Sequence, residues 1–145
     1  MLTIRTMLIL RLCITTWLLS CSLGFAGETR IIKVLPQLLD LHGRNAINPS
    51  LFDRDAYQLY LRQNPTNISA LRFEVQYKAK TIEGSLLLRL ELRGSKTELG
   101  KRHIFETQVK PSRWFASWGR IQLDQSTSEM LGSLVGWRAT LLKDG

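Results

Sequence analysis

The sequence is poor in the residues that form disulfides and metal sites. Only two cysteines, Cys13 and Cys21, and two histidines, His42 and His103, occur among 145 residues. Both cysteines fall in the first 26 residues, so a chain that loses this segment has no thiol for a disulfide or a thiolate metal site. Neither histidine has a cluster of further ligands at metal-binding spacing beside it. We therefore expect no metal and no cofactor.

Signatures of catalysis are equally scarce. The sequence contains no G-x-S-x-G or similar nucleophile motif. Asp53 and Asp55 fit the first turn of a helix, where acids suit the helix dipole, better than they fit a glycosidase pair. We therefore expect a noncatalytic protein with no catalytic residues. An envelope hydrolase with a carboxylate pair remains an alternative, because twelve acidic residues are present.

No apolar run is long enough to cross a membrane. The uncharged stretch Leu12–Ala26 is shorter than the about 20 residues of a spanning helix. Arg5 and Arg11 form a basic start, and Gly24 and Ala26 are small residues before a cleavage point at residue 27. This pattern predicts a secretory signal over 1–26 and one domain over 27–145.

Two alternatives to cleavage at Ala26 would leave the protein on a membrane. The segment could be retained as an anchor. Residues 18–21 also resemble the lipobox of bacterial lipoproteins, in which the cysteine is lipidated, although Leu19 departs from that pattern. We expect an exported protein, periplasmic or extracellular, that contacts a membrane only if Cys21 is lipidated or the leader is uncleaved.

Acidic residues are fewer than basic ones, with 12 Asp and Glu against 20 Lys and Arg and a net charge of +8. The basic residues are spread over several predicted strands and mixed with glutamates, which is typical of a solvated surface. Together with export, this argues against nucleic acid as a partner. An envelope polymer, an anionic surface or a protein partner fits the same charge better.

Alternation of apolar and polar residues dominates the sequence after the leader. The clearest runs are 71–79 and 86–92, which we expect to pair as a hairpin. Its solvated face would then carry cross-strand pairs among Arg72, Glu74, Arg89 and Glu91. Further strands are predicted over 30–35, closed by Pro36, and over 102–110, 118–123 and 135–142.

Two helical segments interrupt the strands. Ser50 is a good N-cap for a helix that runs to Arg62. The apolar side chains with helical spacing on one face of this helix are Phe52, Ala56, Leu59 and Tyr60. Ser126 to Glu129 forms a capping box, which predicts a single helical turn after it.

The last 28 or so residues resemble the end of a fibronectin type III or other immunoglobulin-like domain. Residues 118–145 hold a short strand, a corner containing a leucine, an aromatic-led strand at 137–141 and a glycine turn. Trp137 stands where such domains more often have tyrosine, and the helix over 50–62 is not part of the family pattern. The resemblance implies a mainly β, immunoglobulin-like antiparallel sandwich with one inserted helix, and it implies no activity.

A seventh strand is expected in such a sandwich but only six are predicted. The turn signal at Asp144 and Gly145 follows the strand over 135–142, which would lack its last neighbour. Three interpretations remain open. The sequence is a fragment, the fold is complete with six strands, or a partner donates the missing strand.

One loop has an unusual composition. The candidate ligand or partner surface on it consists of Arg113, Trp114, Phe115, Trp118 and Arg120. Such rings beside cations can stack on sugars or bases or lie at a membrane interface. Alternatively, one or two of the rings close one end of the sandwich core and the arginines stack on them. We expect an exported, noncatalytic binding or accessory module of the cell envelope. The alternative is a structural subunit completed by strand pairing at 135–142.

Overall fold

The computed structural model of the chain describes residues 29–79, 86–110, 112 and 115–143. The predicted signal over 1–26 with Cys21, the turn at 144–145, and Arg113 and Trp114 of the candidate surface lie outside the described residues. In the part of the chain that the structure describes, no helix has the length and apolar character needed to cross a bilayer.

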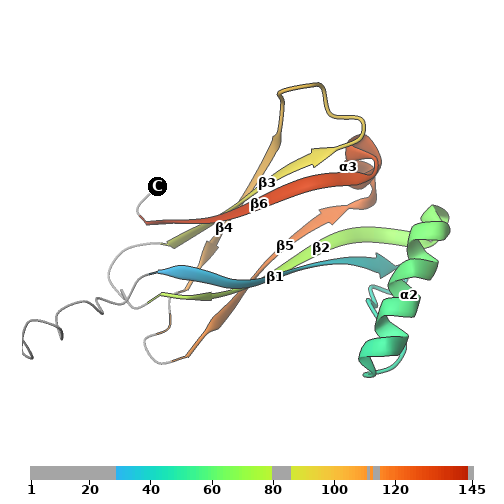
Figure 1. Cartoon of the computed structure of the whole chain (residues 1–145), viewed down its shortest axis with the longest axis horizontal. Helices are drawn as coiled ribbons and strands as arrows, with labels where there is room; N and C mark the ends of the chain where they lie inside the picture. Colours follow the sequence, from blue (N-terminus) through green and yellow to red (C-terminus); the bar gives the residue numbers. More distant parts are fainter. Residues whose placement is uncertain (1–28, 80–85, 111, 113–114, 144–145) are drawn as a thin grey trace, which may run out of the picture.

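The described chain is a mainly β sandwich of two three-stranded antiparallel sheets with an inserted helix (Figure 1). The elements follow in the order β1 (Arg30–Asp40), α2 (Leu51–Gln63), the 3-10 turn η1 (Pro65–Asn67), β2 (Ile68–Lys78), β3 (Leu86–Gly94), β4 (His103–Val109), β5 (Ser117–Asp124), α3 (Gln125–Leu131) and β6 (Leu134–Lys143). Sheet A has the strand order β1-β2-β5, and sheet B has the order β4-β3-β6. The six predicted strands and the helix after Ser50 are therefore confirmed.

The core lies between the two sheets and is built from alternate residues of their strands. Its buried members come from β2, β3, β5 and α3: Leu71, Phe73, Val75, Leu88, Leu90, Leu92, Ile121, Leu123 and Leu131. Burial of one side chain in two along β2 and β3 is what the alternating sequence predicts. The hydrophobic effect on this shared face holds the two sheets together.

The predicted hairpin between residues 71–79 and 86–92 is wrong. β2 is the central strand of sheet A, and β3 is the central strand of sheet B, so the two strands face each other across the core. Alternation shows which face of a strand is buried, but it does not show which strand lies beside it. Two strands with equally apolar faces can bury them by packing face to face instead of side by side.

The predicted charge pairs change with the topology. Arg72 and Glu74 lie on sheet A and pair with each other along β2, with Arg72 Nε 3.5 Å from Glu74 Oε1. Arg89 and Glu91 lie on sheet B, where Arg89 pairs with Glu106 of β4. Each pair therefore stays within its own sheet.

β1 extends past Pro36, which was predicted to close it, and ends at Asp40. Proline has no N–H to donate, but an edge strand has hydrogen-bonding positions that face away from its single neighbour. β1 is the edge of sheet A and pairs only with β2 among the described strands. Pro36 is therefore tolerated inside the strand.

α3 begins two residues earlier than the capping box predicts. Its N-cap is Asp124, whose side chain accepts a 2.9 Å hydrogen bond from the Thr127 N–H. Ser126 lies inside the helix and donates to the same carboxylate. The helix covers seven residues and not a single turn. The prediction considered only Ser126, but Asp is as good an N-cap as Ser.

α2 has the predicted start, because Ser50 Oγ accepts a hydrogen bond from the Asp53 N–H. Its apolar face is exposed, however: the side chains of Phe52, Leu59 and Tyr60 are 81%, 53% and 46% exposed. The helix instead buries Leu61 and Gln58 where it packs on β1. Hydrophobic periodicity thus identified the helix but not the face that it buries.

The Gln58 amide explains this orientation. Its Oε1 accepts from the Leu38 N–H at 2.8 Å, and its Nε2 donates to the Leu38 carbonyl at 2.9 Å and to the Asn45 carbonyl at 2.8 Å. One side chain therefore satisfies both backbone groups of an edge-strand residue, which would otherwise be left unpaired under the helix.

Candidate binding surface

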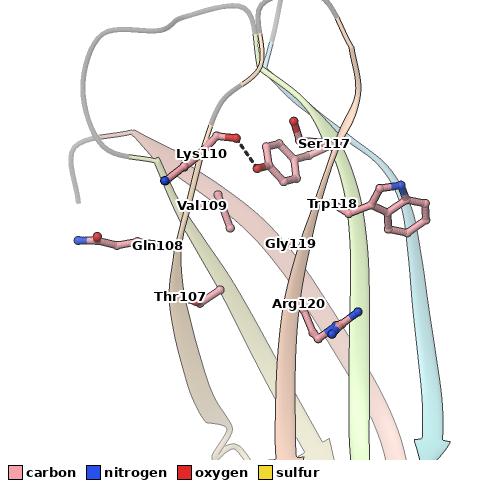
Figure 2. Close-up of a pocket in the computed structure, with 9 residues that line it drawn as sticks. Thr107, Gln108, Val109, Lys110, Ser117, Trp118, Gly119 and Arg120 are labelled. Carbon is pink, nitrogen blue, oxygen red and sulfur yellow. Dashed lines mark hydrogen bonds between the residues drawn. The ribbon is translucent and has the colours of Figure 1, made fainter. Parts of the chain in front are cut away.

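β5 places Trp118 and Arg120 on the outer face of sheet A. Between them, Gly119 faces the core, where an added Cβ would lie 2.8 Å from Leu88 Cδ2 and 3.0 Å from Val109 Cγ1. Position 119 therefore has no room for a side chain, and its two neighbours must point outward. Figure 2 shows Trp118 and Arg120 leaving β5 toward β2 and β1, away from β4.

The described aromatic rings of the candidate surface do not close the core. Trp118 is 50% exposed and Phe115 is 77% exposed. Arg120 does not stack on them but donates a 3.0 Å hydrogen bond to Glu74 Oε1. The alternative in which these rings cap the end of the sandwich is therefore wrong for Phe115 and Trp118.

Strand pairing surrounds Trp118 with basic side chains that are distant in sequence. Trp118 lies opposite Gln76 of β2, which in turn lies opposite Lys33 of β1. The next outward-facing pair toward the start of β1 is Arg30 opposite Lys78. We refer to this part of the outer face of sheet A as the cationic face; it consists of Arg30, Lys33, Lys78, Trp118 and Arg120.

A β-bulge in β1 completes the cationic face. Ile31 pairs with Tyr77 and packs on the core, so strict alternation would also turn Lys33 inward. The register shift between Ile31 and Lys33 inserts one residue and returns Lys33 to the outer face. The inserted Ile32 is 47% exposed. No local sequence signal marks this bulge, and this is why Lys33 was not predicted as a site residue.

The charge of this region is positive. Glu74 is shared between Arg72 on its own strand and Arg120 on β5. Within the described ranges, Arg30, Lys33 and Lys78 have no carboxylate partner within 4.0 Å. Their charges are therefore available to an anionic partner.

A groove of about 410 Å³ lies between the edge strands β4 and β5, and it includes Val109, Lys110, Ser117 and Tyr77 (Figure 2). The Tyr77 hydroxyl donates a 2.7 Å hydrogen bond to the Lys110 carbonyl. Burial raises the pKa of Tyr77, so the phenol stays protonated near neutral pH. Trp118, Gly119 and Arg120 of β5 also line this groove, so it adjoins the cationic face along β5.

A second polar cluster, which sequence reasoning missed, joins β1 to α2. The Asp40 carboxylate accepts hydrogen bonds from the backbone N–H groups of His42 and Arg44, from Arg44 Nε and from the Tyr57 hydroxyl, all at 2.8–2.9 Å. Burial opposes the charge on Asp40, but these donors outweigh it and hold its pKa well below the usual range. Every contact of the carboxylate is internal, so the cluster positions α2.

The two histidines lie apart from this surface, His42 in the exposed turn after β1 and His103 at the start of β4. Among the described residues, no group of three or more His, Cys, Asp and Glu side chains is arranged to hold a metal ion.

Comparison with protein-family models, curated proteins and solved structures finds no match to this chain. The immunoglobulin-like resemblance therefore stays a prediction, although the sandwich itself is present. The function has to be inferred from the chemistry of the cationic face.

Proposed function

We propose that the protein is an exported, noncatalytic binding module of the cell envelope that holds an anionic partner on its cationic face. The observation that carries this proposal is Trp118, a half-exposed indole beside Arg30, Lys33 and Lys78, which form no ion pair with any residue that the structure describes. The indole offers an apolar stacking surface, and the ammonium and guanidinium groups attract carboxylate, sulfate or phosphate groups. The signal-like sequence over 1–26 supports export.

The surroundings of the acidic side chains favour binding over catalysis. Glu74, which pairs with Arg120 of the cationic face, is also engaged by Arg72. Glu91, on the outer face of sheet B, is engaged in the same way by Arg102 and Arg138. A general acid or base needs a free carboxyl group beside a substrate site. Neither glutamate offers one, so a hydrolase is the less favoured alternative.

Affinity electrophoresis tests this function. We expect native protein to be retarded in a gel containing polygalacturonate, an anionic polysaccharide, and to run freely in one containing uncharged dextran. Trp118→Ala is expected to weaken the retardation about three- to fivefold, because the indole ring contacts the partner and the basic side chains beside it. Its melting temperature should stay close to that of the native protein, because the ring is half-exposed.

Ile104→Ala is the matched control, since Ile104 is a 51% exposed apolar side chain on β4 of the other sheet. It should change neither the retardation nor the melting temperature. Equal mobility of the native protein in both gels would argue against the proposal, and so would a collapse of the Trp118→Ala fold.

A second candidate function is that of a structural subunit that pairs through β6. β6 is an edge of sheet B and pairs only with β3 among the described strands. The rings of Trp137 and Phe73 form an edge-to-face pair with their centroids 6.3 Å apart, yet the Trp137 side chain is still 44% exposed. A strand added beside β6 would cover this ring and satisfy the free backbone groups of the edge.

A further inference from the structure

We propose that the anionic partner is a phospholipid bilayer and that the cationic face lies flat on its headgroups. This inference rests on the proposed function and names the partner class. Three observations support it: the spread of the charges over the sheet, the exposed apolar side chains near them, and the sequence that precedes β1.

The cationic face is spread over three strands, and three of its four charges lie outside the groove between β4 and β5. Its residues come from all three strands of sheet A: Arg30 and Lys33 from β1, Lys78 from β2, and Trp118 and Arg120 from β5. Neighbouring strands are about 4.8 Å apart, and outward residues on one strand follow every 6.6 Å or so. The groove between β4 and β5 includes Trp118 and Arg120 in its lining, but Arg30, Lys33 and Lys78 lie outside it. A bilayer surface, which presents many equivalent headgroups, fits such a face better than one small ligand does.

Apolar side chains accompany the charges in the way that an interfacial surface requires. Trp118 is 50% exposed, Ile32 in the bulge is 47% exposed, and Phe115 just before β5 is 77% exposed. Tryptophan prefers the headgroup level of a bilayer, and lysine and arginine extend their charges to phosphates while their stems cover apolar surface. A soluble polyanion would use the charges but would not need Ile32 and Phe115 exposed.

The chain enters the sandwich at the cationic face itself. Arg30 begins β1, and the uncharged, largely apolar stretch Leu12–Ala26 ends only four residues before it. In any form of the protein that keeps a lipid attachment or apolar segment there, the cationic face would be held close to the bilayer. One such anchor alone binds marginally, and a basic surface supplies the second attachment. α2 lies at the opposite end of β1 and leaves the cationic face open (Figure 1).

Vesicle flotation with the full chain tests this inference. The protein is mixed with vesicles of phosphatidylcholine alone or of equal parts phosphatidylcholine and phosphatidylglycerol, and its N-terminus is identified by mass spectrometry. The measured quantity is the fraction of protein bound to anionic vesicles divided by the fraction bound to neutral vesicles. An apolar segment that inserts into both kinds of vesicle equally does not change this ratio. We expect a preference for the anionic vesicles that falls as salt is added.

The decisive variant is Lys33→Glu with Lys78→Glu, because these two lysines come from adjacent strands of the cationic face and have no ion-pair partner among the described residues. Each basic residue close to an anionic surface strengthens binding about fivefold, so the double reversal should lower the ratio about 25-fold or more. If the charge-reversed variant does not fold, Lys33→Gln with Lys78→Gln removes the two charges without reversing them. It should also lower the ratio, by a smaller factor.

The control is Arg93→Glu with Lys101→Glu, which changes the net charge equally at two exposed positions of β3 and the loop after it. It should keep the native ratio. An equal loss in this control would overturn the inference, because net charge and not the cationic face would then decide binding. Native protein without a preference for anionic vesicles would overturn it as well.

The polygalacturonate gel distinguishes failure of the bilayer inference from failure of the proposed function. Protein that binds the polysaccharide through Trp118 but ignores anionic vesicles would refute the bilayer and leave the proposed function standing. Protein that binds neither partner would refute both. Protein that prefers anionic vesicles, with the loss confined to the Lys33 and Lys78 variants, supports the inference.

Discussion

At the scale of single residues, Asp40 shows how a buried charge is stabilised in this protein. It is only 5% exposed, yet four donors from His42, Arg44 and Tyr57 surround it. Loss of the carboxylate costs more than an average hydrogen bond contributes, because hydrogen bonds to a charged acceptor are stronger than those between neutral groups. Its neighbours in sequence are ordinary turn residues, so nothing local distinguished this aspartate from a solvated one.

We predict that Asp40→Asn lowers the free energy of unfolding by about 2 kcal/mol at neutral pH. The folded state holds the pKa of Asp40 below its unfolded value, so this stability is fully present above the ordinary carboxyl pKa of about 3.9 and is lost as the pH falls below it. Urea titrations of both proteins should therefore converge in acid. Asp55→Asn, at a 74% exposed carboxylate on α2, is the control and should match native protein throughout. A difference independent of pH would contradict this account.

Glycine is required at Gly94 for a steric reason. An added Cβ would lie 1.9 Å from the Leu131 carbonyl oxygen, because the end of β3 packs directly on the end of α3. Such a contact with backbone cannot be relieved by a side-chain rotation. No local sequence pattern indicates this close approach, because it joins residues that are 37 positions apart.

At the scale of elements, α2 separates what periodicity predicts from what packing decides. Its N-cap at Ser50 was predicted because capping is a local hydrogen bond between residues three apart. Its buried side, which holds Gln58 and Leu61, was not predicted. The hydrogen bonds from Gln58 to β1 determine that side, and they join residues 20 positions apart in the sequence.

Two leucines two positions apart test this orientation. Leu61 is 0% exposed and Leu59 is 53% exposed, so the same substitution should have different effects. We predict that Leu61→Ala lowers the free energy of unfolding by about 2–4 kcal/mol, because it leaves a cavity under the helix. Leu59→Ala should change it by less than about 0.5 kcal/mol. Urea unfolding followed by circular dichroism measures both, and equal losses would mean that α2 buries its apolar face after all.

At the scale of the whole molecule, the arrangement of the two sheets leaves β6 as a ten-residue edge without proline. β1, by contrast, has Pro36 and two register shifts, whereas the pairing of β6 with β3 has one shift, at Val135. Proline, bulges and charges are the usual protections of an edge against further pairing. β6 is therefore the less protected of these two edges, which is the physical basis of the second candidate function.

Pairing through β6 predicts self-association or capture of a strand. Val135 is 72% exposed on β6, and a lysine there should hinder pairing by placing a charge at the edge. Light scattering over a range of concentrations should show assembly of native protein and a shift toward monomer for Val135→Lys. Leu99→Lys, at a 99% exposed loop position, is the matched control and should assemble as native protein does. A native monomer with one cooperative thermal transition at every concentration would refute self-pairing.

The candidate surface was only partly predictable from the sequence. Trp118 and Arg120 were identified because tryptophan and arginine concentrate in one loop, and strand alternation around Gly119 turns both outward. Arg30, Lys33 and Lys78 could not be identified, because they join the same face only through the pairing of β1, β2 and β5. A β-bulge, which has no reliable local signal, decides the orientation of Lys33.

The sequence by itself determined the positions of the strands, their buried faces and the start of α2. These properties depend on side-chain periods of two or about 3.6 and on hydrogen bonds between near neighbours. Only the tertiary structure decided that β2 and β3 belong to different sheets, that α2 buries Gln58 and Leu61, and that basic residues collect around Trp118. The physical reason is that partners of a strand or helix are selected by the burial and hydrogen bonding of the whole chain, and many pairings satisfy the same local pattern.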